Sequence, residues 1–288
     1  MDGFLVREAV AGGLARSSLY SGRYAAPFHG VRTAREPDGH LALCRAALLA
    51  LPDQVILSHR SAAVLHGIPL PRRAEPALVE VSVLEPQRTP RRRGVLAHQL
   101  TPTGQRVVTI DGMRAFAPEE VWVQLGTALG PDELTVAGDY VIAGTEPYDG
   151  APPPATRSQL DGALRRHGRH RGVANLRAAA GRIRYGSLSP QETRLRLALQ
   201  DAGLPEPELN YGVADGDGRV RAMIDLAYPG FGVAIEYLGD HHRATSTAYR
   251  ADITRRELLV RLGWEVVFVT AADPLPAVAA RVRTLLRR

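Results

Sequence analysis

The sequence contains no lysine, because all 36 of its basic residues are arginines. Any cationic group in a functional site must therefore be Arg or His. The single cysteine, Cys44, excludes an internal disulfide and a thiolate zinc cluster, and we interpret it as a small buried apolar residue. No apolar run has the length of a signal peptide or a membrane span, which predicts a cytoplasmic protein without a membrane partner.

The chain has 288 residues, of which 45% are hydrophobic and 23% charged, and this predicts two globular domains. Residues 1–150 carry 15 Arg against 16 Asp and Glu, whereas residues 151–288 carry 21 Arg against 14. Excess positive charge attracts polyanions, so we expect a nucleic-acid partner, with a merely solvated basic surface as the alternative. Nothing indicates an organic cofactor.

The first 145 residues predict an α+β module of winged-helix type. Residues 40–66 indicate a helix, a turn at Pro52–Asp53 and a short helix from Ser58, in the outline of a helix-turn-helix. Strands follow at 78–84, 94–99, 107–110 and 113–117, with Asp111–Gly112 as a hairpin turn, and helices begin at Pro118 and near Pro131. Arg91–Arg93 lies between two of these strands, as a DNA-contacting wing tip or a solvated hairpin.

A Pro-rich stretch at 145–156 marks a linker, and we assign 146–186 to this linker and a basic helical connector. Residues 187–288 predict a separate α/β domain, a short mixed sheet between helices. The expected order is helix 190–202, strands 208–213, 219–227 and 232–238, helix 247–262, strand 264–269 and helix 274–287.

Two acidic residues stand at the centre of neighbouring predicted strands. Gly230 suits the first central position of a type II′ turn, and pairing about that turn places Asp225 directly opposite Glu236. Apolar neighbours add desolvation to the repulsion between these carboxylates, and a hard divalent cation, Mg²⁺ or Mn²⁺, would relieve both. The alternative places both acids on the solvent face of the sheet, paired with Arg219 or Arg221.

The same region resembles the DUF559 branch of the PD-(D/E)XK nucleases, which is similar to the very-short-patch repair endonucleases. The resemblance covers roughly residues 187–288. It is carried by Ser189-Pro190-Gln191-Glu192, Asp225, Glu236-Tyr237, Gly239, His242, Asp252, Arg255 and Gly263-Trp264. It implies a restriction-endonuclease-like core and Mg²⁺-dependent hydrolysis of DNA phosphodiesters.

The resemblance also implies roles for individual residues. Asp225, Glu236 and the backbone carbonyl of Tyr237 would hold the metal ion, which activates water and stabilises charge on the phosphate. The catalytic residues would be Asp225, Glu236, Glu192, His242, Asp252 and Arg255. We also expect His241, Arg243, Arg256 and Arg60 to contact DNA.

Two features depart from the family pattern. Leu238 occupies the position where relatives carry a polar group, and no lysine exists elsewhere to replace it. His242, His241 or Arg255 would then take the polar role, or Asp240 would act as a displaced carboxylate. Ordinary structural roles also suit two of the residues: Glu192 completes a capping box with Ser189, and Asp252 and Arg255 have the spacing of a surface pair on a helix.

The segment LSHRSAAVLHGIPLP resembles the start of the AbiEi antitoxin-like region. Its residues 58–61 would present a helix N-terminus to phosphates, or simply cap a buried helix. We therefore predict a DNA endonuclease acting in repair, phage defence or a toxin-antitoxin context. The alternatives are a catalytically silent, antitoxin-like transcriptional regulator with DNA and a toxin or other protein as partners, and an interaction protein whose carboxylates only pair with arginine.

Overall fold

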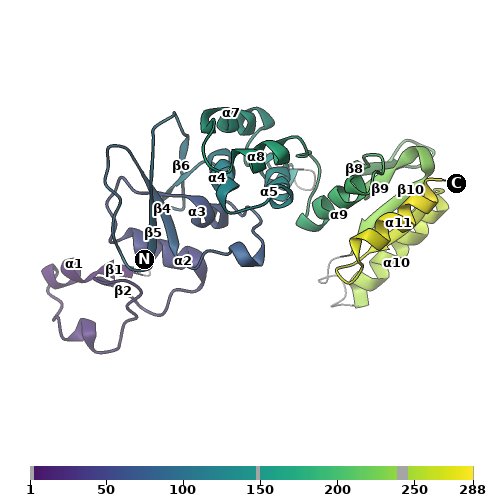
Figure 1. The fold of residues 1–288 in the computed structure, drawn as a ribbon. Coiled ribbons are helices and arrows are strands. Elements are labelled where there is room, and N and C mark those ends of the chain that lie inside the picture. Colours follow the sequence, from purple (N-terminus) through teal and green to yellow (C-terminus); the bar gives the residue numbers. More distant parts are fainter. Residues whose placement is uncertain (1–2, 147–149, 239–245, 288) are drawn as a thin grey trace. The chain divides into compact units, whose positions relative to one another are not determined.

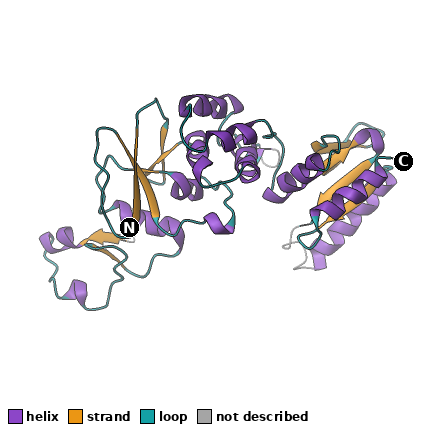
Figure 2. Cartoon of the chain, viewed as in Figure 1, coloured by secondary structure: helices purple, strands orange, loops and turns teal. Residues whose placement is uncertain are grey.

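The computed structural model describes residues 3–146, 150–238 and 246–287, without the side chains of 246–253. The chain is a mixed α/β protein and separates into two compact units, each with helices and strands (Figures 1 and 2). The first unit comprises Met1–Ala137 and Pro154–Gly181, and the second comprises Gly138–Pro153 and Arg182–Arg288. Within the described ranges, no helix combines the length and the apolar character needed to cross a membrane.

The first unit begins with a small antiparallel ribbon that the sequence did not suggest. Strand β1 (Gly3–Leu5) pairs with β2 (Val31–Thr33), and α1 (Val6–Ala11) and a 3₁₀ turn (Ser18–Tyr20) lie between them. Arg32 is buried and its guanidinium donates to the carbonyl of Leu19 at 2.7 Å. This bond ties the ribbon to the turn.

A five-stranded mixed sheet forms the core of the first unit. Its order is β5-β4-β3-β7-β6, from β3 (Ile56–Leu57), β4 (Val79–Leu84), β5 (Val95–Leu100), β6 (Val107–Ile110) and β7 (Met113–Phe116). The β6–β7 hairpin turns at Asp111 and Gly112, both with positive φ, as the sequence predicted.

The expected helix-turn-helix and the Arg91–Arg93 hairpin are both wrong. Strand β3 stands between α2 (Gly39–Leu48) and α3 (His59–Leu65), so the two helices are not joined by a turn. Strands β4 and β5 are parallel, and Arg91–Arg93 therefore lies in a crossover rather than at a hairpin tip. Arg92 donates to the carbonyls of His29 and Ala50, which secures this crossover.

The basic helical segment belongs to the first unit, which differs from the predicted connector 146–186. Helices α4 (Pro118–Gln124), α5 (Pro131–Ala143), α7 (Arg157–His167) and α8 (Val173–Ala180) follow the sheet, with a 3₁₀ turn at Leu125–Thr127. Gly172, at φ 87°, approaches Gly126 so closely that an added Cβ would lie 2.5 Å from its backbone. Arg166 also forms an ion pair with Glu120, so these helices pack on the unit instead of spanning a gap.

The second unit follows the predicted order of elements. It contains α9 (Pro190–Asp201), β8 (Glu208–Ala214), β9 (Val220–Tyr228), β10 (Val233–Tyr237), α10 (Ser246–Arg261), β11 (Glu265–Val269) and α11 (Leu275–Leu285). The sheet order is β11-β10-β9-β8, and only the β10–β11 pair is parallel. The expected mixed sheet is confirmed.

Apolar residues pack on both faces of this sheet. One cluster joins α9 and α11 to the strands through Leu195, Leu199, Leu226, Ile235, Val267 and Val282. The other joins α10 to the opposite face through Val213, Ile224, Ala227, Ala234 and Leu259. The central strands β9 and β10 each contribute residues to both clusters, so helices cover both faces of the sheet.

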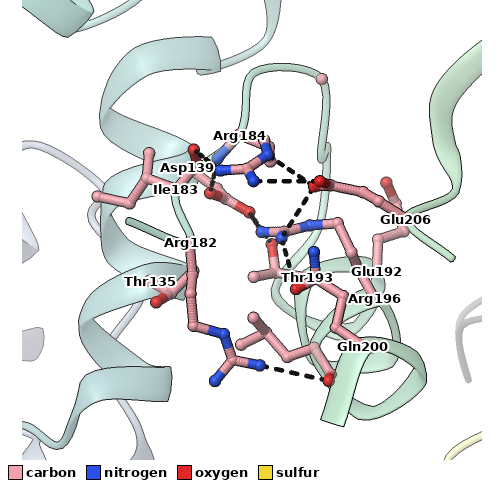
Figure 3. A network of polar contacts seen from close by, with 12 residues as sticks. Thr135, Asp139, Arg182, Ile183, Arg184, Glu192, Thr193, Arg196, Gln200 and Glu206 are labelled. Atoms are coloured by element: carbon pink, nitrogen blue, oxygen red, sulfur yellow. Dashed lines mark hydrogen bonds and ion pairs between the residues drawn. The ribbon is translucent and has the colours of Figure 1, made fainter. Parts of the chain in front are cut away.

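A buried ion pair anchors α9 to the C-terminal part of α5 (Figure 3). Nη2 of Arg196 lies 2.7 Å from Oδ2 of Asp139, and both side chains are at most 1% exposed. Asp139 also accepts from the Thr193 hydroxyl and from the Arg184 backbone amide. Burial raises the pKa of Asp139 and the Arg196 guanidinium opposes that rise, so the anchor depends on every partner being present.

We expect Asp139→Ala to lower the free energy of unfolding by about 3–5 kcal/mol, because it leaves the Arg196 charge buried without compensation. Urea denaturation measures this change. Asp201→Ala removes the exposed pair with Arg182 and should cost less than about 1 kcal/mol. Equal costs for the two variants would show that the buried pair does not anchor α9.

Candidate carboxylate site

The register between β9 and β10 is the one the sequence predicted. Tyr228 pairs with Val233, and Leu226 with Ile235, so extending the ladder by one step brings Asp225 opposite Glu236. The predicted turn is wrong, however. A 3₁₀ turn at Pro229–Phe231 joins the strands, and the left-handed residue is Gly232, at φ 64°, rather than Gly230.

Strand β9 is distorted at Asp225. Ile224 packs in the cluster under α10, whereas Leu226 packs in the cluster under α9 and α11, although alternate residues of a regular strand share a face. On the neighbouring strand β8, Asn210 has a φ of 47° at the same level. Asp225 therefore lies at a local twist, where its Oδ2 accepts a hydrogen bond from the Tyr237 amide at 2.8 Å.

Arg255 of α10 holds the carboxylate of Glu236. Its Nη2 lies 2.9 Å from Oε2 of Glu236, and it also donates to the backbone carbonyl of Met223. The Glu236 side chain is buried, whereas that of Arg255 is 40% exposed. The Nε atom of Arg255 is buried without a hydrogen-bond partner, which leaves one N–H donor unused at the site.

Burial, followed by repulsion from Asp225, raises the pKa of Glu236 to about 8, although Arg255 opposes the shift. A carboxyl with this pKa keeps its proton at neutral pH. Burial and the neighbouring Asp225 charge therefore outweigh the Arg255 guanidinium in setting the pKa of Glu236.

Glu192 joins this group from the first turn of α9. Its Oε2 accepts from the Leu188 amide at 2.9 Å, and its own amide donates to the Ser189 hydroxyl at 3.2 Å. Burial and the nearby Asp225 charge raise the pKa of Glu192 to about 7. The capping role and the site role, which the sequence presented as alternatives, are therefore compatible in one residue.

The donor set fits a hard divalent cation in its chemistry, because the half-buried Asp225 and the buried Glu236 both supply carboxylate oxygens. In the part of the chain that the structure describes, no group of three or more His, Cys, Asp or Glu side chains could hold a metal ion. Further ligands would have to be backbone oxygens such as the Tyr237 carbonyl, water or substrate oxygens.

The remaining predicted site residues have different outcomes. His241, His242, Arg243 and Asp240 lie outside the described residues, and so does the side chain of Asp252, which is in α10. Arg256 is exposed on α10, and the half-buried Leu238 donates its amide to the Val269 carbonyl at 2.7 Å.

Arg60 is not a free cation for DNA, because its guanidinium is paired with the buried Glu80. Ser58 and Ser61 are fully buried too, and their hydroxyls bond within this first-unit core. The alternative pairing of the acids with Arg219 or Arg221 also fails for Arg221, which pairs with Asp215 at 2.6 Å. Glu236 is buried under α10 instead of facing solvent.

Sequence reasoning named Arg255 as a site residue but did not predict two ion pairs that support the site. The pairing of Arg255 with Glu236 spans 19 residues, and the Asp139–Arg196 pair that fixes α9 spans 57. Neither spacing falls within one element, so local periodicity carries no signal for them. The sequence hints at these ion pairs only by placing ionisable residues among apolar ones.

Comparisons with known proteins leave the family open. No protein-family profile matches the chain. Two uncharacterized Mycobacterium tuberculosis proteins, Rv2248 and its counterpart MT2308 from another strain, are each 26% identical over 249 residues, covering 85% of this chain and 85% of their own length. A crystal structure of the M. tuberculosis RV2827C protein aligns with 75% of this chain and 84% of its own, at 15% identity and a TM-score of 0.41, which is too low to establish a shared fold.

The raised pKa of Glu236 predicts that the free energy of unfolding decreases as pH rises. Between the ordinary glutamate pKa, near 4.5, and about 8, unfolded Glu236 is ionised while the folded protein keeps the proton, so the folded state loses stability as pH rises through this window. We expect Glu236→Gln to flatten this fall and to raise the melting temperature at pH 8 by roughly 5 °C. Thermal melts from pH 5 to pH 8 measure the slope.

The matched control is Glu265→Gln, which makes the same change at an exposed position of β11. It should leave the pH slope of the wild type unchanged. A Glu236→Gln slope that matches the control would mean that Glu236 ionises normally in the folded protein.

Proposed function

We propose that the second unit is a metal-dependent DNA endonuclease of the DUF559 type, with a restriction-endonuclease-like core. The observation that carries the proposal is that Asp225 lies near two carboxyl groups with raised pKa values, Glu236 and Glu192, and that Arg255 pairs with Glu236. The order α9-β8-β9-β10-α10-β11 supports it, because the sheet places one acid on each of two paired strands. Perturbed carboxyl groups gathered around one cation are typical of functional sites.

Asp225 and Glu236 would hold the metal ion, Mg²⁺ or Mn²⁺. When bound, such an ion lowers the pKa of water and stabilises negative charge on a phosphate. The Tyr237 amide fixes the orientation of Asp225, and Arg255 fixes that of Glu236. Each carboxylate therefore keeps a defined geometry before substrate arrives, which is the preorganisation that electrostatic catalysis requires.

Two further groups can act on the reacting phosphodiester. Glu192, with a pKa of about 7, can accept or release a proton near neutral pH, as a general acid or base must. The Arg255 side chain is 40% exposed, so its guanidinium can donate to a phosphate oxygen while it stays bonded to Glu236. His242, Asp252, His241, Arg243 and Arg256 remain expected contributors on the basis of the resemblance.

The first unit would regulate or guide this activity as an antitoxin-like module. This assignment rests on the resemblance of residues 57–71, since the central mixed sheet and the strand β3 between α2 and α3 depart from a simple helix-turn-helix. Repair, phage defence and toxin-antitoxin biology are the contexts that the resemblance suggests. A toxin or other protein partner belongs to the same proposal.

A second candidate function is a DNA-binding transcriptional regulator that has lost catalysis. Leu238 favours the silent regulator, because a leucine can neither bind a metal ion nor orient water. The DUF559-type nucleases that the chain resembles carry a polar group at this position. The pairing of Glu236 with Arg255 would then be a structural ion pair. The two candidates differ in one observable, which is cleavage of the DNA they bind.

Cleavage of supercoiled DNA in the presence of Mg²⁺ or Mn²⁺ tests the endonuclease. We expect the wild type to nick the DNA, and Asp225→Asn and Glu236→Gln each to lower the rate by at least about 100-fold, because each removes a charge from the metal-binding pair. Agarose-gel conversion of supercoiled to nicked circles gives the rate.

Glu265→Gln is again the control, and circular dichroism checks that all variants are folded. Nicking that persists in Asp225→Asn and Glu236→Gln would come from a contaminant or from another site. Salt-sensitive DNA binding without any nicking by the wild type would favour the silent regulator.

Metal binding is testable without catalysis. We expect Mn²⁺ to raise the melting temperature of the wild type more at pH 8 than at pH 5.5, because protons compete with the metal for carboxyl groups whose pKa values are raised. At a metal concentration of 100 times Kd the stabilisation would be about 2.7 kcal/mol. Asp225→Asn should abolish the shift, and a shift that it retains would place the ion elsewhere.

A further inference from the structure

The turn between α7 and α8 is a strongly basic segment of the first unit. The seven residues 165–171 contain four arginines, two histidines and a glycine, and no acidic residue. Arg165, Arg169 and Arg171 are exposed, and none of them has an ion-pair partner among the described residues. Arg166, by contrast, is paired with Glu120 and fastens the turn to the unit.

The sequence alone places the excess of arginine in residues 151–288. Because this turn belongs to the first unit, that excess moves to the first unit. Residues 1–137 carry 15 arginines and 13 acidic residues, and residues 154–181 add six arginines and a single acid. The second unit carries 15 arginines and 16 acidic residues. The excess positive charge therefore belongs to the first unit and is concentrated in its last helical pair.

The helix dipole explains only part of this pattern. Cations in the last turn of a helix stabilise it, and Arg165, Arg166 and His167 occupy the last turn of α7. Arg169 and Arg171 lie beyond the end of the helix, where that benefit has faded. Uncompensated charges so close together repel each other, and a bound polyanion would relieve the repulsion.

The surface around the turn is hollowed on more than one side. A hollow of about 370 Å³ is lined by His167, His170 and Arg171 together with amide and hydroxyl side chains such as Gln99, Thr101 and Gln124. Two shallower hollows adjoin Arg165, one of them beside Arg177 and the other beside Arg106. One acidic residue also lines each hollow, and each of these is paired with an arginine: Glu120 with Arg166, Asp161 with Arg157 and Glu119 with Arg106. The remaining cations and neutral donors suit phosphate oxygens, which accept hydrogen bonds from both.

We propose that this basic turn, Arg165 to Arg171, is a docking surface for the phosphate backbone of double-stranded DNA. The choice of DNA among polyanions rests on the function proposed above, whereas the surface itself does not involve the carboxylate site. The turn replaces Arg60, which is committed to Glu80, as the DNA contact of the first unit. Backbone contacts of this kind give salt-sensitive binding without base preference.

The test is duplex binding by the full chain, measured by fluorescence anisotropy in EDTA over a range of salt concentrations. The variant R165A/R169A/R171A should bind at least about tenfold more weakly. The slope of log K against log salt should become shallower by about 2–3, since three phosphate contacts are lost. The control is R16A/R35A/R88A, which removes three exposed arginines from the same unit and should bind within about twofold of the wild type.

Equal weakening of both triple variants would overturn the proposal, because general charge would then explain the binding. So would unchanged binding by R165A/R169A/R171A. Displacement of the duplex by polyglutamate as effectively as by unlabelled DNA would overturn the choice of DNA. EDTA separates this result from the endonuclease proposal, since a chain that never cleaves can still bind through the turn, and circular dichroism confirms folding.

Discussion

Repulsion between two carboxylates on adjacent strands is the interaction around which the second unit is organised. Extending the β9–β10 register by one step places the half-buried Asp225 opposite Glu236, which is buried and pairs with Arg255 of α10. Among the described residues, the Arg255 guanidinium pairs with Glu236 and the Tyr237 amide donates to Asp225, and the raised pKa of Glu236 favours the neutral form of that carboxyl. An arrangement that costs stability is seldom kept for folding alone, because apolar residues of similar size would pack at the same positions without this cost.

Much of the second unit was accessible from the sequence, because its information is local. Apolar residues around Asp225 and Glu236 indicated β9 and β10, and Ser189-Pro190 marked the start of α9. The register followed from the length of the connection, and it survived an error in the turn: a 3₁₀ turn ending at Gly232 spans the same residues as the predicted two-residue loop with its flanks. Asp225 and Glu236 were thus placed together correctly, although their dependence on Arg255 was not foreseen.

The first unit was less accessible, because its architecture depends on contacts between distant segments. A two-residue strand such as β3 has no periodicity to detect, yet it lies at the centre of the sheet. Parallel pairing of β4 with β5 likewise leaves no local mark, since the same alternation suits a hairpin. The placement of α7 and α8 depends on a glycine contact, Gly126 against Gly172, between segments 46 positions apart, so a composition-based boundary divided the unit incorrectly.

Because the sequence has no lysine, arginine must supply the positive charge in both proposals. At the carboxylate site, the cation comes from α10 as Arg255 and not from the strand position that Leu238 occupies. Arginine remains protonated at any relevant pH, so it can orient a carboxylate and neutralise a phosphate, but it cannot exchange a proton. Proton transfer would then fall to Glu192, whose pKa of about 7 suits it to that role. In the proposed endonuclease, Arg255 would therefore supply the positive charge and Glu192 would exchange the proton.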